Sequence, residues 1–178
     1  MIDGVHGRSC YPLMGCPAAR SLRTAPMRPS LEVHVRTARH TDLNAVARLM
    51  ARDADDPRAE LDDVDYLRNL LFVPSATVIV AEAERRVVGV GVLALRPSVR
   101  SGPFVGIVDE LGLARADLDA ADRRGIADAI VEHLSTSARN KGCTRVEVSE
   151  PLASAEPSLW KRLGFASRGR TLGRQLGR

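Results

Sequence analysis

Aromatic residues and cysteine are scarce in this chain of 178 residues. Phe, Trp and Tyr make up only 3% of the sequence, too little for a surface that binds nucleic acid by base stacking. The cysteines, Cys10, Cys16 and Cys143, are odd in number and lack metal-ligand spacing, so neither a disulfide framework nor a metal site is indicated. Apolar runs that approach the ~20 residues needed to span a bilayer are missing too. We therefore expect a soluble, cytoplasmic protein with no membrane partner.

Positive charge is in excess only at the two ends of the chain. The net charge is +4, but four arginines lie in residues 1–30 and four in residues 168–178. This leaves 18 of the 26 basic and 21 of the 22 acidic side chains in residues 31–167. Because the body of the chain is mildly acidic, its charge argues against nucleic acid as a partner.

The sequence divides into an irregular start and one patterned domain. Residues 1–30 contain four prolines and four arginines without any period, which is typical of a disordered extension. From residue 31 to residue 178 the composition is that of a globular domain, since the whole chain is 44% hydrophobic and 27% charged. We expect one domain over 31–178.

Hydrophobic periodicity predicts alternating strands and helices in this domain. Valine-rich or alternating segments predict strands over 31–38, 76–83, 87–95, 104–114 and 143–149, with further strands at 164–169 and 170–176. Apolar residues at helical spacing predict helices within 42–50, 52–71, 122–139 and 154–163. Gly142 is expected to end the long third helix as a C-terminal cap.

The stretch DRRGIADAIVEHL, residues 122–134, places a glycine just before an apolar helical stripe. Gly125 in the first turn would lie among unpaired amides at the positive end of the helix dipole, which suits a phosphate. The alternative is a helix that begins near Asp117 or Asp119, because helical spacing continues backwards through Leu118. In that case Gly125 is buried in the middle of the helix and no phosphate site exists.

Four phrases in a fixed order carry a resemblance to a known family. VIVAEAERRVVGVGVL, DELGLA, RRGIADAIVEHL and WKRLGF resemble the GNAT superfamily of N-acetyltransferases over about residues 33–172. The resemblance implies an α/β fold, with a central mixed sheet of about six to seven strands, helices on both faces, and splayed fourth and fifth strands. It also implies acetyl-CoA as co-substrate and direct transfer of its acetyl group to a primary amine.

The resemblance also implies which residues bind acetyl-CoA. The pantetheine arm would bond to the fourth strand at Leu111, Leu113 and Ala114, as an added strand does. The diphosphate would meet backbone amides at the next helix, at Arg123, Arg124, Gly125, Ile126 and Ala127. Asp122 departs from the family pattern, which has glutamine or arginine at this position, and we expect it to cap the helix instead.

The expected catalytic groups are carboxylates of the fourth strand. The resemblance favours Glu110 as the base that takes the amine proton, with Asp109 as the alternative, because alternation sends the two side chains to opposite faces. Trp160 stands where relatives often have a tyrosine acid, and an indole N–H does not release a proton near neutral pH. Leu152 stands where an asparagine is common. A catalytically degenerate protein that binds acyl-CoA or acts as a regulatory partner is therefore the alternative function.

Acidic residues follow the first helix, in the part of the chain where similar enzymes build their acceptor pocket. They favour a small-molecule or peptide amine that is cationic, through their electrostatic field. A homodimer is a further possible arrangement. The acids are Asp53, Asp55, Asp56, Glu60, Asp62, Asp63 and Asp65.

Overall fold

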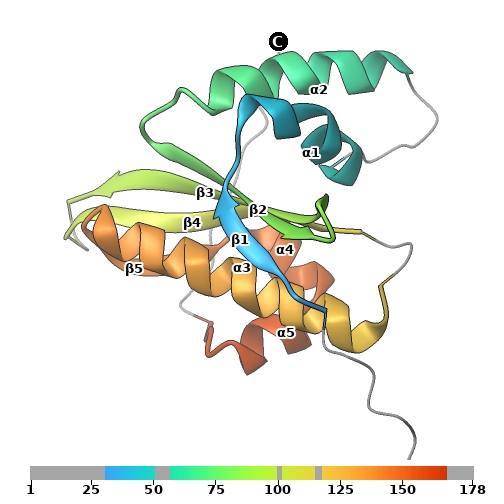
Figure 1. Ribbon diagram of the computed structural model, residues 1–178. Coiled ribbons are helices and arrows are strands. Elements are labelled where there is room, and N and C mark those ends of the chain that lie inside the picture. The colour runs from blue at the N-terminus through green and yellow to red at the C-terminus, as the bar shows by residue number, and fades with distance from the viewer. Residues whose placement is uncertain (1–30, 51–56, 100–101, 115–117, 168–178) are drawn as a thin grey trace, which may run out of the picture.

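The chain forms a mixed sheet of five strands between two layers of helices (Figure 1). The computed structural model describes residues 31–50, 57–99, 102–114 and 118–167, and the side chains of 57–63 lie outside the description. In chain order the elements are β1 (His34–Thr37), η1 (His40–Asp42), α1 (Leu43–Met50), α2 (Pro57–Leu70), β2 (Ala76–Ala83), β3 (Arg86–Ser98), β4 (Gly102–Leu113), α3 (Ala120–Asn140), β5 (Cys143–Val148), α4 (Glu150–Ala155) and α5 (Pro157–Arg162).

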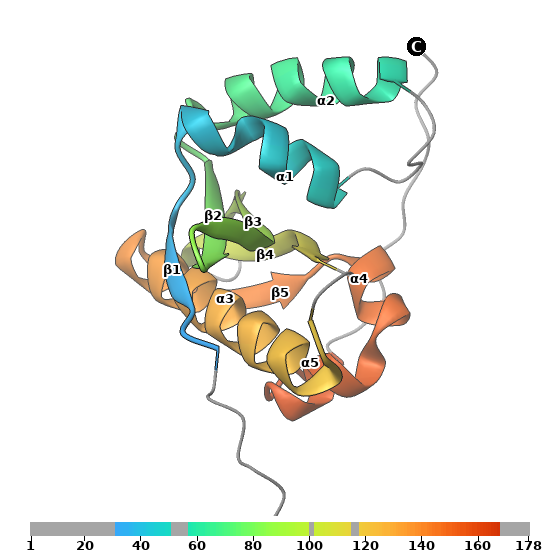
Figure 2. The ribbon, with the colours of Figure 1, turned by 45° about the vertical axis from the view of Figure 1, so that its right-hand side comes forward.

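The order of strands in the sheet is the order in the sequence, β1-β2-β3-β4-β5. The first four strands pair antiparallel, and β5 returns parallel to β4 after the crossover helix α3. Helices α1 and α2 cover one face, and α3 covers the other, with α4 and α5 beside it (Figures 1 and 2). This arrangement confirms the expected α/β class with helices on both faces.

The expected strand at 164–169 is not formed over its described residues. Gly164 turns the chain at φ +82°, and the amide of Phe165 then bonds to the carbonyl of Trp160 at 2.9 Å. The Phe165 ring packs edge-on against Trp160 of α5, so this segment folds back on the helix and does not extend as a strand. The segment 170–176, for which another strand was expected, lies outside the described residues, as does the extension 1–30.

Each face of the sheet has its own apolar core. Ile79, Leu93 and Val108 pack against buried residues of α3, whereas Val80, Val90 and others pack against α1 and α2. Glycine on β3 lets α3 approach closely, because a Cβ at Gly91 would lie 2.5 Å from a methyl carbon of Ile130. Within the described residues, none of the helices combines the length and apolar character needed to span a membrane.

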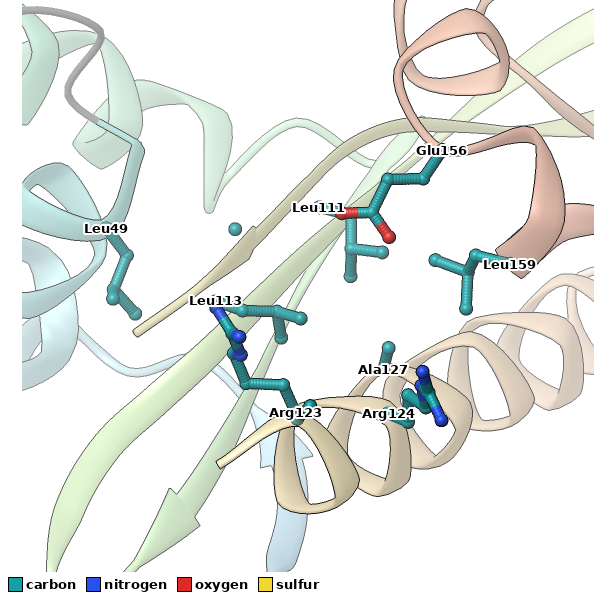
Figure 3. Close-up of a pocket in the computed structure, with 10 residues that line it drawn as sticks. Leu49, Leu111, Leu113, Arg123, Arg124, Ala127, Glu156 and Leu159 are labelled. Atoms are coloured by element: carbon teal, nitrogen blue, oxygen red, sulfur yellow. The ribbon is translucent and has the colours of Figure 1, made fainter. Parts of the chain in front are cut away.

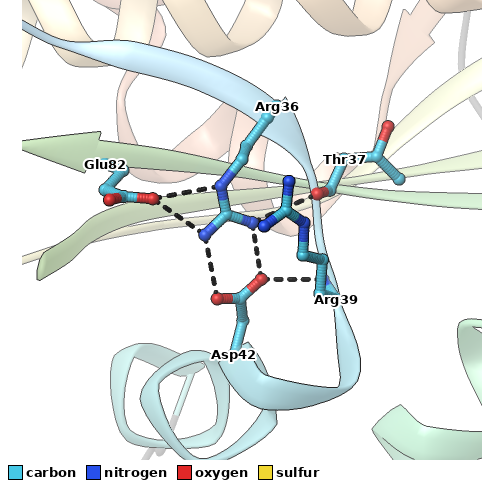
Figure 4. A network of polar contacts seen from close by, with 5 residues as sticks. All are labelled: Arg36, Thr37, Arg39, Asp42 and Glu82. Carbon is cyan, nitrogen blue, oxygen red and sulfur yellow. Dashed lines mark hydrogen bonds and ion pairs between the residues drawn. The ribbon is translucent and has the colours of Figure 1, made fainter. Parts of the chain in front are cut away.

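A buried ionic network joins β1, η1 and β2 (Figure 4). The Arg36 guanidinium donates to both carboxylate oxygens of Asp42, at 2.7 and 3.0 Å, and to one oxygen of Glu82, at 2.8 and 3.0 Å. The amide of Arg39 donates to Asp42 as well, at 2.7 Å. These hydrogen bonds, with that from Arg36 the strongest, lower the pKa of Asp42 against the opposing effect of burial. Hydrogen bonding to Asp42 likewise raises the pKa of Arg36.

Candidate active site

Strands β4 and β5 separate before β4 ends. Their last paired residues are Val108 and Val148, and the amide of Ser149 still bonds to the Val108 carbonyl at 2.9 Å. Beyond this point β4 continues to Leu113, while the chain after β5 turns into α4. One edge of β4 over residues 109–113 is thus without a strand partner among the described residues, as expected for splayed strands.

A bulge at Asp109 decides where Glu110 lies. Val92 pairs with Glu110 and Leu93 pairs with Val108, so Asp109 has no opposite residue on β3. Cross-strand partners lie on the same face of a sheet, and Val92 belongs to the core under α1 and α2. Glu110 is therefore on that face and half-buried, whereas Asp109 is exposed. Simple alternation would have placed Glu110 on the α3 face, because it takes no account of the bulge.

The backbone of β4 offers hydrogen-bonding groups along its open edge. The amide of Ala114 bonds to the carbonyl of Val88 on β3, at 2.9 Å. Since antiparallel pairs alternate in direction, the N–H and C=O groups of Leu111 and Leu113 point away from β3. The expected arm-binding groups at Leu111 and Leu113 face the gap, but the amide of Ala114 is already bonded within the sheet.

A cavity of about 440 Å³ lies beside this open edge (Figure 3). Residues of β4, α3 and the start of α5 surround it, and α1 contributes Leu49. Among the residues for which cofactor binding was expected, five line it, whereas Ala114, Gly125 and Ile126 do not. The lining residues are Leu49, Leu111, Gly112, Leu113, Ala120, Arg123, Arg124, Ala127, Glu156 and Leu159.

The charged groups of the cavity are divided between its two sides. Arg123 and Arg124 belong to α3, and Glu156 precedes α5 and directs its carboxylate between Leu111 and Leu159 (Figure 3). Neither arginine side chain has an ion-pair partner among the residues that the structure describes. The cavity therefore presents two exposed cations on one side, apolar leucines along its floor, and a carboxylate on the other side.

Helix α3 begins earlier than the DRRG stretch suggests. Asp119 is its N-cap, and its carboxylate Oδ1 accepts from the amides of Ala121 and Asp122, both at 2.8 Å. The amide of Arg123 bonds to the Asp119 carbonyl at 3.0 Å. The capping residue is thus Asp119 and not Asp122, and the alternative start near Asp119 is correct.

Gly125 lies in the second turn of α3, and this changes its interpretation. In an α-helix every amide from the fifth residue onward bonds to the carbonyl four residues back, so the amides from Arg124 to Ala127 are paired within α3. Ile126 is buried in the core. Gly125 is exposed, and a Cβ there would contact nothing within 4 Å. The glycine is neither buried, as the alternative expected, nor in the first turn.

We predict that Gly125→Ala raises the free energy of unfolding by about 0.5–1 kcal/mol, because alanine fits an exposed helical site without the entropy cost of glycine. Gly142→Ala is the matched control. It lies at φ +78°, where a Cβ is strained although space is available, so this variant should lose stability. Urea denaturation of both variants measures the difference. A loss of stability in Gly125→Ala would contradict the helical placement of Gly125.

Trp160 is a core residue and not part of the cavity lining. It is 4% exposed, and its indole N–H donates to the carbonyl of Leu152 at 2.8 Å. This bond holds α4 against α5 at the positions where relatives often have asparagine and tyrosine. The sequence alone is compatible with Trp160 as a cleft wall or as a core residue, and the structure shows the core position.

Sequence reasoning missed half of the cavity residues. Leu49 and Leu159 read only as apolar faces of helices, and Gly112 as part of a strand. Glu156 stands between two helices in the phrase SAEPSLW, where no spacing rule singles it out. The one feature of the sequence that could have indicated Glu156 is Pro157, because proline is common at the first position of a helix and Glu156 is then the N-cap residue of α5.

Comparison with known proteins decides the family. The sequence profile described as "Acetyltransferase (GNAT) family" matches residues 43–165, more than half of the chain. The chain belongs to the GNAT acetyltransferase family. A comparison with curated proteins gives no significant match in sequence.

Solved structures with the same fold include several acetyltransferases. The aminoglycoside N-acetyltransferase AAC(6')-Iy in complex with CoA has 16% identity and a TM-score of 0.66, covering 84% of this chain and 98% of its own. AAC(6')-Ih from Acinetobacter baumannii has 15% identity and a TM-score of 0.67, covering 82% and 99%. A ribosomal-protein-alanine N-acetyltransferase from Brucella melitensis biovar Abortus 2308 has 19% identity and a TM-score of 0.63, covering 82% and 100%. At these identities the likeness shows that this GNAT protein shares their fold.

Proposed function

We propose that this GNAT protein is an N-acetyltransferase that moves an acetyl group directly from acetyl-CoA to a primary amine. The observation that carries the proposal is the open edge of β4 beside the cavity. An extended chain with amide groups binds such an edge as an added strand does, and pantetheine is a chain of this kind. Leu111 and Leu113 offer the backbone groups, and their side chains with Leu159 give the arm an apolar floor.

The reaction needs a base more than it needs an acid. Acetyl-CoA supplies the activated acetyl group as a thioester. The free amine attacks the thioester carbonyl, a C–N bond forms, the C–S bond breaks, and CoA leaves as a thiolate. Glu110 takes the proton of the amine, directly or through a water, and Asp109 is the alternative base. Since a thiolate is a stable leaving group, Trp160 is not required as an acid.

The acceptor is a cationic amine of a small molecule or peptide. Glu110 places a carboxylate next to the open edge, on the side of the sheet that α1 and α2 cover, and the exposed Asp109 precedes it at the bulge. Of the acidic residues expected near the acceptor, Asp65 of α2 is exposed and forms an ion pair with Arg68. The others lie outside the description: the whole residues Asp53, Asp55 and Asp56, and the side chains of Glu60, Asp62 and Asp63. Two of the similar structures are aminoglycoside acetyltransferases, which agrees with a small-molecule amine.

Two measurements test the proposal. Acetyl-CoA at millimolar concentration should raise the melting temperature of the full chain, because a ligand that binds only the folded state stabilises it. Free CoA should then be released in the presence of a panel of polyamines, aminoglycosides and peptide amines. If acetyl-CoA causes no thermal shift and no amine causes release of CoA, the proposed acetyltransferase activity is wrong and only the fold assignment remains.

Leu111→Pro tests the strand-edge contact directly. The Leu111 amide points away from β3, so proline removes a donor at the open edge without removing a bond between β3 and β4. Loss of that donor leaves a buried acceptor on the ligand unpaired, and we expect roughly tenfold to hundredfold weaker binding of acetyl-CoA. Leu111→Ala keeps the amide and is the control, since it loses only apolar contact. Equal losses in both variants, measured by calorimetry, would exclude the backbone contact.

A catalytically degenerate acyl-CoA-binding or regulatory protein is the second candidate. The burial of Trp160 favours it, because no proton donor occupies the position of the family tyrosine. The same assays separate the two functions. A thermal shift with acetyl-CoA but no CoA release with any amine supports the second candidate.

A further inference from the structure

The amides in the first turn of α3 are already bonded to a carboxylate of the chain itself, that of Asp119. The Asp119 carboxylate accepts from the amides of Ala121 and Asp122 at 2.8 Å each, and its carbonyl takes the amide of Arg123. The amides after these are paired inside the helix. Among the described amides from Ala121 onward, a diphosphate at this helix would find no free donor, and it would also meet the negative charge of Asp119.

Apart from the amide of Ala120, the groups of α3 left for a diphosphate are the side chains of Arg123 and Arg124. Arg123 and Arg124 line the cavity but are exposed to water. Contacts between exposed charges are weak, because solvent screens them and long side chains lose entropy when they are fixed. The open edge of β4 and the leucine floor, by contrast, contact the part of the donor that carries the thioester.

We propose that this protein recognises its donor by the pantetheine arm, and that Asp119 keeps the nucleotide diphosphate off the amides of Ala121 and Asp122 in the first turn of α3. The inference rests on the proposed function and adds which part of the acetyl donor the protein recognises. The substrate class that follows is any acetyl thioester of pantetheine, with or without the adenosine diphosphate portion. Asp119 acts as the specificity-determining residue, because its carboxylate takes the place that a phosphate would otherwise fill.

The first experiment compares two donors on the unaltered full chain. Calorimetry measures the dissociation constants of acetyl-CoA and of acetyl-pantetheine, which lacks the phosphates and the nucleotide. Two exposed arginine contacts are the main expected difference, so acetyl-CoA should bind no more than about thirtyfold more tightly. A preference for acetyl-CoA of roughly a hundredfold or more, beyond what exposed charge pairs supply, would overturn the inference and leave the proposed function intact.

The second experiment removes the internal anion. Glycine is a good N-cap, so Asp119→Gly should keep the start of α3 while it uncovers the amides of Ala121 and Asp122. Acetyl-CoA should then bind roughly tenfold more tightly, because a phosphate gains charge-assisted hydrogen bonds, whereas binding of acetyl-pantetheine should not change. A merely structural role of Asp119 would alter both donors equally.

Glu132→Gln is the matched control for charge. Glu132 is exposed on the same helix, so this variant removes one negative charge without uncovering any amide of the first turn. It should leave both dissociation constants unchanged. If Asp119→Gly does not change the ratio of the two constants, the inference is wrong. If neither donor binds the unaltered chain, the proposed function fails and the inference fails with it.

Discussion

Replacing Glu110 by glutamine is expected to lower kcat for acetyl transfer by about 10²- to 10⁴-fold, the usual contribution of a positioned base. Glutamine keeps the size of the side chain and loses the ability to take a proton. Because Glu110 lies on the α1 and α2 face of β4 and not in the cavity lining, binding of acetyl-CoA should stay within about twofold, a difference of a few tenths of a kcal/mol. Steady-state kinetics with calorimetry of the donor separates the two effects.

Asp109→Asn is the matched variant for Glu110→Gln. Asp109 is the bulged residue next to Glu110, and its carbonyl accepts a hydrogen bond from Ser149 at 3.1 Å. The backbone of Asp109 thus holds the start of α4, and its exposed side chain should matter less for the rate. If Asp109→Asn abolishes transfer while Glu110→Gln retains it, the roles of the two carboxylates are exchanged and Asp109 is the base.

Replacing Arg36 by methionine is expected to lower the free energy of unfolding by about 3–5 kcal/mol, since it leaves a buried carboxylate without its counter-charge. Asp42 is 7% exposed and would keep the hydrogen bond from the Arg39 amide and the nearby charge of Arg39, and Glu82 would lose its hydrogen bonds from Arg36. A domain is usually stable by only ~5–15 kcal/mol, so the variant should unfold at much lower urea concentrations. Equilibrium denaturation measures the change.

The pH dependence of this effect has a definite sign. The pKa of Asp42 is lowered in the folded state, chiefly by its hydrogen bonds to Arg36. Its contribution to stability is therefore complete above the pKa of an unfolded aspartate, about 3.9, and disappears as the pH falls through the lower folded value. The difference in stability between the unaltered chain and Arg36→Met should narrow below about pH 4.

An exposed ion pair on α2 gives the control for the buried network. Arg68 and Asp65 form a pair of side chains that are 53% and 72% exposed. Asp65→Asn should change the free energy of unfolding by less than about 1 kcal/mol, as is usual for surface pairs. If Asp65→Asn and Arg36→Met lower the free energy of unfolding by similar amounts, the burial of Asp42 does not explain the loss of stability in Arg36→Met.

Most of the fold was predictable because its signals are local. Alternation and valine content marked all five described strands, and Glu84 and Arg85, which lie between the strands expected at 76–83 and 87–95, form a turn with positive φ. Gly142 ends α3 with φ +78°, as its position in the sequence predicted. The strand expected at 164–169 was wrong over its described residues, because the chain turns back at Gly164 and the Phe165 ring packs against Trp160.

The site was less predictable than the fold. Leu111, Leu113, Arg123, Arg124 and Ala127 were named for cofactor binding and line the cavity, and their role there stays a prediction. The start of α3 was left between two alternatives, because the segment before Gly125 holds several aspartates that can each cap a helix. Sequence spacing does not say which carboxylate reaches the free amides.

Apart from the single helix expected at 154–163, where the structure has α4 and α5, the sequence by itself determined the five described strands, three of the helices and their order along the chain, and the phrases that resemble the GNAT family. These depend on neighbouring residues, whose periodicity of two or 3.6 fixes which side chains share a face. Only the tertiary structure decided where β5 leaves β4, which face the bulge gives to Glu110, and that Asp119 occupies the first turn of α3. The first two depend on backbone hydrogen bonds between strands that are distant in sequence, and the third on which of several neighbouring aspartates turns its carboxylate to the free amides of α3.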